Sequence, residues 1–357
     1  MSSDLIEKLW YRRHRPLWPL LPLSWLYRSV AESKRRRAQA EQPGRLALPV
    51  VVVGNITAGG TGKSPLTARL VQLMTAHGWR PVILSRGYGG KSESYPLQVT
   101  DTTPAGVCGD EPLMLARATG CPVVVDPDRL RGARHAIDNQ LGDVLICDDG
   151  LQHYRLPRDI ELAVFDGRRG VGNGALIPVG PLREPVQRLS EVDFVVVNGG
   201  PAAVEPNGGA SYAGVPHPQV HTMALKPSAL VNLNSGERQP PEALYDRGVR
   251  AVAGIGNPSR FFDTLRGLGA RVTEKPFPDH HHFRPEDLGF HRGEWLVMTA
   301  KDAVKCRGIA PDNAWMLTVE ASLPKVFEQR FLERLADCAG RPANAPSDDQ
   351  TQRHDHG

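Results

Sequence analysis

The feature that most constrains this chain is a strand-like run followed at once by a glycine-rich turn, in the stretch LPVVVVGNITAGGTGKSP from Leu48 to Pro65. Four consecutive valines predict a strand that is buried on both faces. After Lys63, leucines and Met74 recur at helical spacing, and Gly78 is well placed to end the helix. A strand, a glycine-rich loop and a helix in this order are typical of a phosphate-binding loop, or P-loop.

Each part of this loop has a role in binding a nucleotide. Backbone N–H groups and the helix N-terminus bind phosphates, Lys63 reaches the outer phosphates, and Ser64 offers its hydroxyl to Mg²⁺. The strict motif has glycine where this chain has Thr57, so the early loop must adopt a conformation open to a side chain. The alternative is a glycine-rich turn that binds nothing. The predicted nucleotide-binding residues are Thr57, Ala58, Gly59, Gly60, Thr61, Gly62, Lys63 and Ser64.

Apolar runs alternate with helical patterns along most of the chain, which predicts an α/β fold with a mostly parallel sheet covered by helices. The expected strands of the first region are 50–53, 81–84, 122–125, 144–147, 162–165 and 194–197. A stretch rich in Gly, Pro and Ala, 199–218, is the expected linker. A second, smaller α/β region is expected to have strands at 249–253, 295–299 and 315–319, with helices at 259–268 and 325–338.

Two sets of acidic residues follow expected strands or turns. Asp148 and Asp149 end the strand 144–147, where open α/β sheets bind ligands, and paired carboxylates there suit Mg²⁺. An Asx turn before the next glycine is the alternative. Asp110, in GDEP, either caps a short helix from Glu111 or accepts a proton from a substrate hydroxyl. The sequence leaves these two roles of Asp110 open.

Three further motifs carry less information by themselves. Arg86 lies in LSRGYGG, which binds a phosphate or simply turns. Three histidines follow Asp279 in PFPDHHHF; an imidazole oriented by a carboxylate is a better functional reading than zinc, and solvated loop histidines are the alternative. TAKDAVK, 299–305, resembles a guanine-recognition signature but lacks the residue between lysine and aspartate, which argues against GTP.

Basic and aromatic residues gather at the N-terminus. The first 45 residues contain ten Lys and Arg against four Asp and Glu, although the net charge of the whole chain is only +4. The apolar run Leu17–Tyr27 is about half the ~20 residues of a membrane-spanning helix, and two prolines interrupt it. Such a segment predicts association with an anionic membrane surface; a signal peptide and a helix packed on the core are the alternatives. No nucleic-acid recognition module is recognisable.

Taken together, the motifs carry a family resemblance. VGNITAGGTGKSP, LSRGYGG, GDEP, CDDGLQHYRL, PLREP, FPDHHHF and KDAVK occur in the order, and at about the separations, found in the lipid A 4′-kinases, or tetraacyldisaccharide 4′-kinases. That family's P-loop also lacks the first glycine, so Thr57 is consistent with membership. The resemblance runs from the N-terminal basic segment to about residue 335.

The resemblance implies a P-loop NTPase-like domain joined to a second α/β domain by β-strands. It implies transfer of the γ-phosphate of ATP, with Mg²⁺, to the 4′-hydroxyl of a tetraacylated glucosamine disaccharide 1-phosphate. The enzyme would act at the cytoplasmic face of a Gram-negative inner membrane, with the lipid A precursor and an anionic lipid surface as partners and no obligate protein partner. The expected segments are 1–28 for the membrane, 29–205 for the kinase domain, 206–228 for linker strands, 229–322 for the second domain, 323–340 for a helix returning to the first domain, and 341–357 for a disordered tail.

Site roles follow from the resemblance residue by residue. Lys63 and Ser64 would bind phosphates and Mg²⁺, and Asp148 or Asp149 would join the metal site. Asp110 would be the base for the 4′-hydroxyl, with His280 orienting or tuning it. The residues expected at the substrate are Arg86, Asp110, Gln152 and His153. The competing hypothesis is a P-loop nucleotide hydrolase that acts as a switch or assembly factor with a protein partner.

Overall fold

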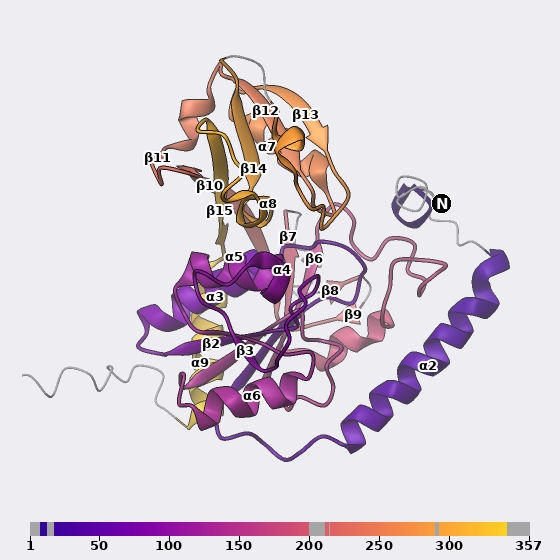
Figure 1. Ribbon diagram of the computed structural model, residues 1–357. Helices are drawn as coiled ribbons and strands as arrows, with labels where there is room; N and C mark the ends of the chain where they lie inside the picture. The colour runs from indigo at the N-terminus through magenta and orange to yellow at the C-terminus, as the bar shows by residue number, and fades with distance from the viewer. Residues whose placement is uncertain (1–7, 13–17, 200–210, 214, 290–292, 341–357) are drawn as a thin grey trace, which may run out of the picture. The chain divides into compact units, whose positions relative to one another are not determined.

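A computed structural model describes residues 8–12, 18–199, 211–213, 215–289 and 293–340 of the chain (Figure 1). The expected tail 341–357 and parts of the expected membrane segment lie outside these residues. The chain divides into two compact units. Unit 1 takes in residues 1–86, 121–224 and 323–357, and unit 2 takes in 87–120 and 225–322.

Unit 1 contains a parallel sheet whose strands are buried on both faces. Its order is β10-β7-β6-β1-β5-β2-β4, and every pairing in this order is parallel. The strands are β1 (Val50–Gly54), β2 (Pro81–Ser85), β4 (Val123–Val125), β5 (Val144–Asp148), β6 (Ile160–Asp166), β7 (Phe194–Asn198) and the first residues of β10 (Val220–Asn232). Apart from β10, these are the apolar runs that predict strands, and the α/β fold class is confirmed.

Amphipathic helices of unit 1 bury their apolar faces. α3 (Lys63–Ala76) packs on β1 and β5 with Leu66, Leu70 and Met74 buried, and α6 (Arg129–Asp138) packs on β2 and β4. α9 (Lys325–Ala339) belongs to unit 1 and buries Phe327, Phe331 and Leu335. α2 (Leu21–Ala40), which also belongs to this unit, is the long indigo helix of Figure 1. The short strands β8 (Ser211–Tyr212) and β9 (Val215–Pro216) pair with each other.

Unit 2 contains a smaller sheet and two separate stretches of chain. Its strand order is β13-β12-β14-β15-β10-β11, parallel from β13 to β15 and antiparallel between β10 and β11. The elements are α4 (Ala105–Cys108), α5 (Asp110–Thr119), β3 (Leu97–Gln98), β11 (Arg238–Gln239), β12 (Gly248–Ala253), α7 (Pro258–Gly267), β13 (Arg271–Pro276), β14 (Trp295–Thr299), α8 (Ala300–Cys306) and β15 (Ala314–Ser322). Short 3-10 or π turns lie at Lys8–Arg12, Trp18–Leu20, Val186–Glu191, Pro241–Leu244 and Pro285–Leu288.

The division corrects one expected boundary. Residues 87–120 lie within the expected kinase domain 29–205, but the structure groups them with the second unit. The physical reason is packing: α5 contacts α8 of unit 2, and nothing in the local sequence of a helix specifies which sheet it covers. Asp110 and LSRGYGG beyond Arg86 therefore belong to unit 2.

Candidate active site

The P-loop runs from the end of β1 to the start of α3. Its backbone has positive φ at Gly59 (101°) and Gly62 (97°), and a Cβ at Gly62 would lie 2.5 Å from Asn198 Nδ2. Thr57 is 2% exposed, has no positive φ, and pairs with Leu182 as an isolated antiparallel bridge. The PLREP segment, which contains Leu182, thus holds the early loop in an extended conformation that accepts a side chain. This explains why the loop needs no glycine at residue 57.

Lys63 is the first residue of α3 and points back across the loop. Its Nζ lies 3.3 Å from Asn55 Oδ1 and 3.3 Å from Asp149 Oδ1. Asn55 in turn donates from Nδ2 to the carbonyl of Gly59 at 3.2 Å. The lysine is therefore held between the end of β5 and the loop, where an ammonium group can bind the outer phosphates of a nucleotide.

Two neighbouring aspartates end β5. Asp148 is 2% exposed; its Oδ2 accepts from Ser64 Oγ at 3.1 Å and its Oδ1 from Thr67 Oγ1 at 2.7 Å. Burial favours the neutral form of Asp149, but the positive charges of Lys63 and Arg183 outweigh burial and lower its pKa. A hydroxyl and two carboxylates at one sheet edge are hard oxygen donors of the kind Mg²⁺ takes. The donor set fits the predicted metal site of Ser64, Asp148 and Asp149.

The loop after Asp149 places two more of the predicted residues. Gln152 donates from Nε2 to the carbonyl of Asn55 at 3.0 Å and to Glu184 Oε1 at 2.6 Å. Burial, together with the charges of Arg129 and Arg86, lowers the pKa of His153 to about 3, so this imidazole is neutral at physiological pH. Arg86 is exposed at the end of β2. The structure therefore brings Gln152, His153 and Arg86 to the same sheet edge as the P-loop.

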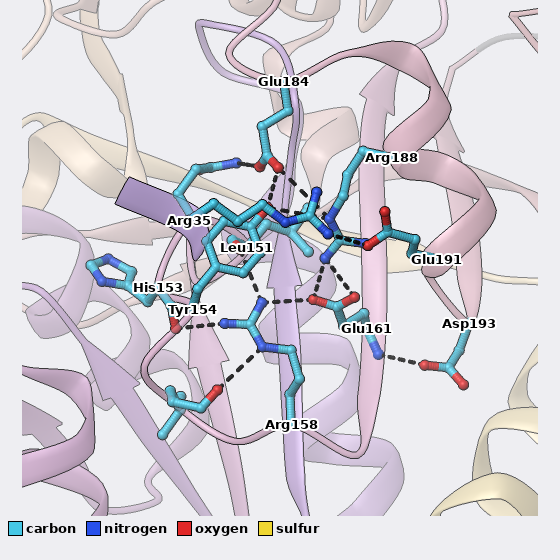
Figure 2. A network of polar contacts seen from close by, with 12 residues as sticks. Arg35, Leu151, His153, Tyr154, Arg158, Glu161, Glu184, Arg188, Glu191 and Asp193 are labelled. Atoms are coloured by element: carbon cyan, nitrogen blue, oxygen red, sulfur yellow. Dashed lines mark hydrogen bonds and ion pairs between the residues drawn. The ribbon is translucent and has the colours of Figure 1, made fainter. Parts of the chain in front are cut away.

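A buried ion network lies behind this loop; it comprises Tyr154, Arg158, Glu161, Glu184 and Arg188 (Figure 2). Arg188 Nη2 lies 2.6 Å from both carboxylate oxygens of Glu161, and Arg158 Nη1 lies 2.7 Å from Oε1 of the same residue. Tyr154 donates to Glu184 and accepts from Arg188 Nε at 3.3 Å. Since Glu184 also holds Gln152, the network connects the core of unit 1 to the loop that bears Asp149.

In unit 2, the structure excludes the capping reading of Asp110, and the role of Asp110 as a base stays a prediction. The capping reading, with a helix from Glu111, is wrong: α5 begins at Asp110 itself, and its N-cap is Gly109, with φ 94°. A Cβ at Gly109 would lie 2.8 Å from the carbonyl oxygen of Tyr88, so the LSRGYGG and GDEP motifs pack backbone to backbone. The Asp110 side chain does not cap the helix. It is 9% exposed, and its Oδ2 lies 3.2 Å from His280 Nδ1.

Two histidines of the run contact different carboxylates. His280 has a left-handed backbone (φ 60°) and contacts Asp110, with the Tyr88 ring 4.8 Å away between centroids. His281 bonds Asp287 Oδ2 at 3.0 Å and stacks on Phe277. Among the described residues, no group of three or more His, Cys, Asp and Glu is arranged to hold a metal ion.

Two residues that the sequence analysis did not select complete this cluster. Lys305 Nζ lies 3.6 Å from Asp110 Oδ2, and Lys301 Nζ lies 3.3 Å from His280 Nε2. Both come from KDAVK, which forms α8. The signal was available in the i,i+4 spacing of the two lysines, which places them on one helix face directly after a strand end.

Fold and loop together define a P-loop nucleotide-binding protein, with a lysine and serine at the start of α3 and an acidic pair at the end of a neighbouring strand. Comparison with known proteins narrows this class. The family model for LpxK, tetraacyldisaccharide-1-P 4′-kinase, matches residues 16–336, so the chain belongs to this family.

Named relatives agree with this assignment. The chain is 46% identical to the tetraacyldisaccharide 4′-kinase of Ectopseudomonas mendocina over 94% of its own length and 98% of the relative's. It is 48% identical to that of Alkalilimnicola ehrlichii, over 93% and 97%. Among solved structures, it resembles LpxK from Aquifex aeolicus in complex with ATP, with a TM-score of 0.72 and 29% identity over 89% of this chain and 98% of that chain.

Proposed function

We propose that this chain transfers the γ-phosphate of ATP to the 4′-hydroxyl of a tetraacyl glucosamine disaccharide 1-phosphate, a lipid A precursor. Membership of the tetraacyldisaccharide-1-P 4′-kinase family over residues 16–336 carries this conclusion. In the reaction, the O–H bond of the acceptor breaks, its oxygen bonds the γ-phosphorus, and the bond from phosphorus to the leaving ADP oxygen breaks. The protein must therefore position ATP, offset negative charge and accept one proton.

We assign the nucleotide end of the reaction to unit 1. The P-loop backbone from Thr57 to Gly62 binds phosphates, and Lys63 exchanges its contact with Asp149 for the outer phosphates. Ser64, Asp148 and Asp149 would hold Mg²⁺, and the bound ion would offset charge on the phosphate oxygens. Arg86, Gln152 and His153 stay assigned to the substrate. Gln152, already bonded to Asn55 and Glu184, also fixes the loop that carries Asp149.

We assign to Asp110 the role of the base that accepts the proton of the 4′-hydroxyl. Both nitrogens of His280 already have partners, since Nδ1 faces Asp110 and Nε2 faces Lys301. His280 therefore orients the carboxylate, while Asp110 accepts the proton of the 4′-hydroxyl. Family membership favours this kinase over the alternative of a nucleotide-driven switch, which would need a protein partner rather than a lipid.

We also propose that the enzyme acts at the cytoplasmic face of the inner membrane as a peripheral or monotopic protein. No helix among the described residues is both long and apolar enough to cross a bilayer. α2 instead exposes Leu23, Trp25, Leu26 and Val30 and carries Arg28, Lys34, Arg36 and Arg37. Apolar and basic side chains on one exposed helix suit an anionic lipid surface.

The test is a transfer assay in detergent micelles with γ-labelled ATP, Mg²⁺ and the tetraacyl disaccharide 1-phosphate. Label is expected in the lipid, and Lys63→Ala is expected to abolish its appearance. Asp110→Asn is expected to lower kcat by about 100-fold or more while ATP binding persists. Phosphate released to water equally well without lipid would support the switch instead, and unchanged turnover of the Asp110 variant would remove it from the mechanism.

A further inference from the structure

Lys301 occupies an unusual place beside the proposed base. Its side chain is 14% exposed, and its Nζ lies 3.2 Å from Glu111 Oε1, 3.0 Å from Asp279 Oδ1 and 3.3 Å from His280 Nε2. An ammonium group has three N–H donors and no acceptor. Three acceptor atoms around one ammonium therefore take one N–H each, and one of those acceptors is a ring nitrogen.

Its surroundings stabilise the charged form of Lys301. Burial works against the charged form, but Glu111 and Asp279 outweigh burial and raise its pKa. A charged Lys301 can only donate, so His280 Nε2 must be the unprotonated nitrogen. A proton on Nε2 would set donor against donor, and an imidazolium would set two cations side by side.

The second nitrogen of the ring then has a defined state. In a neutral imidazole one nitrogen carries the proton, and here it is Nδ1, which lies 3.2 Å from Asp110 Oδ2. Nδ1–H donates to the carboxylate and fixes its orientation. On the far side, Lys305 lies 3.6 Å from the same oxygen and is itself held by Asp302 at 3.0 Å.

We propose that Lys301 is a positioning residue: it fixes the Nδ1–H tautomer of His280 and thereby holds Asp110 as an oriented, ionised base. The two lysines of α8 have different roles. Lys301 determines which nitrogen of the imidazole carries the proton, and Lys305 places positive charge beside the Asp110 carboxylate. The proposal rests on the proposed role of Asp110. The tautomer of His280, however, can be measured by NMR without any assay of the reaction.

The first test is the wild-type ¹⁵N spectrum of protein labelled at histidine, near pH 7.5. The chain has 12 histidines, and the His280 signals are assigned by their loss in His280→Gln. The expected pattern for His280 is a protonated Nδ1 and an unprotonated Nε2. A protonated Nε2, or an imidazolium, in the wild type would overturn the proposal whatever any variant does.

Variants then test the cause. Lys301→Met is expected to convert His280 to a mixture containing the Nε2–H form, while Lys301→Arg, which keeps a charged donor, restores Nδ1–H. Lys226→Met is the control, because Lys226 is an exposed lysine on β10 of the same unit. If the tautomer in Lys301→Met matches the wild type, the proposal fails. If Lys301→Met does not fold, the wild-type spectrum and Lys301→Arg still decide the matter.

Kinetics give a separate readout. Lys301→Met is expected to lower kcat about 10–100-fold with little change in KM for ATP, as for other groups that orient a histidine. Lys301→Arg, which keeps a charged donor, is expected to recover most of this loss. Equal losses in Lys301→Met and Lys301→Arg would contradict the proposal. A changed tautomer with unchanged kcat in both Lys301→Met and Asp110→Asn would instead show that the assignment of Asp110 as base has failed.

Discussion

Single residues at both proposed centres have backbones that side chains rarely adopt. Asp149 has φ 52° and His280 has φ 60°. Left-handed conformations of residues other than glycine cost free energy, and such strained residues cluster at functional sites. In each case ionic or polar neighbours oppose the cost: Lys63 and Arg183 contact Asp149, and Asp110 contacts His280. The backbone thus aims each side chain, and its partners hold it there.

His153 gives a prediction at this scale. The unfolded chain binds a proton at this residue near pH 6.5, whereas the folded imidazole, with a pKa of about 3, stays neutral. The unfolded state therefore takes up more protons as the pH falls from 6.5 towards 3. Stability from this group is complete above pH 6.5 and is lost across that window, by up to about 1.4 kcal/mol per pH unit.

Urea unfolding at pH 7.5, 6.5 and 5.5 measures this effect. His153→Gln should show a shallower fall in the free energy of unfolding than the wild type. His221, whose pKa burial and Arg330 lower to about 4, should supply part of the slope that remains. Equal slopes for the variant and the wild type would mean that folding does not lower the pKa of His153.

At the scale of elements, the buried ion network joins β6, the turn Val186–Glu191 and the loop after β5. α2 reaches this network as well: the Arg35 guanidinium lies 4.9 Å from the centroid of the Tyr154 ring, and Arg35 also pairs with Glu191 (Figure 2). Arg188 is 3% exposed and Glu161 is 7% exposed. Removing one member of such a buried pair leaves an uncompensated charge, which costs far more than an exposed pair contributes.

Arg188→Met is therefore expected to destabilise unit 1 by about 3 kcal/mol, because only Arg158 still offsets Glu161. Arg334→Met is the control: it breaks an exposed pair with Asp193 and should cost under about 1 kcal/mol. Chemical denaturation followed by circular dichroism compares the two. Adding Glu161→Gln to Arg188→Met should recover part of the loss, and equal losses in the two single variants would contradict a buried, charged network.

Elements with apolar residues on both faces could be predicted from sequence, and others could not. The valines of β1 and the run Phe194–Asn198 are fully buried, so their composition alone identifies them. β13 (Arg271–Pro276) escaped prediction because it is an edge strand whose polar residues are mostly exposed. β10 is 13 residues long and crosses the expected boundary between the linker strands 206–228 and the second domain 229–322, with no change in composition to mark it.

Some residues of the candidate site could likewise be predicted from sequence, and others could not. Local motifs predicted Lys63, Ser64 and the acidic pair, because a P-loop and a strand end are short-range features. The partner of Asp110 lies 170 residues away at His280, so no local spacing indicated the contact. Family resemblance named His280. Sequence spacing placed Lys301 and Lys305 on one helix face, but their contacts, like those of Glu184, are visible only in the folded chain.

At the scale of the whole molecule, we expect the exposed side chains of α2 to bring the enzyme to a membrane surface. Trp25 is 66% exposed and Leu26 is 61% exposed. Replacing both with serine removes the two most exposed large apolar side chains of α2. Co-flotation with vesicles containing anionic lipid is expected to fall about tenfold or more, whereas Tyr245→Ser, at a residue 78% exposed in unit 2, should leave it unchanged. Full retention of the double variant would locate membrane binding elsewhere.

The division of the chain has a practical consequence for anyone who dissects this enzyme. The chain passes between the units at 86/87, 120/121, 224/225 and 322/323. A gene fragment encoding 225–322 would therefore omit α4 and α5 and with them Asp110, while a fragment ending at 224 would lack α9 and leave the apolar contacts of Phe327 and Phe331 unmade. No single cut in the gene yields either unit whole. Separate expression requires a circularly permuted or spliced open reading frame that joins 87–120 to 225–322.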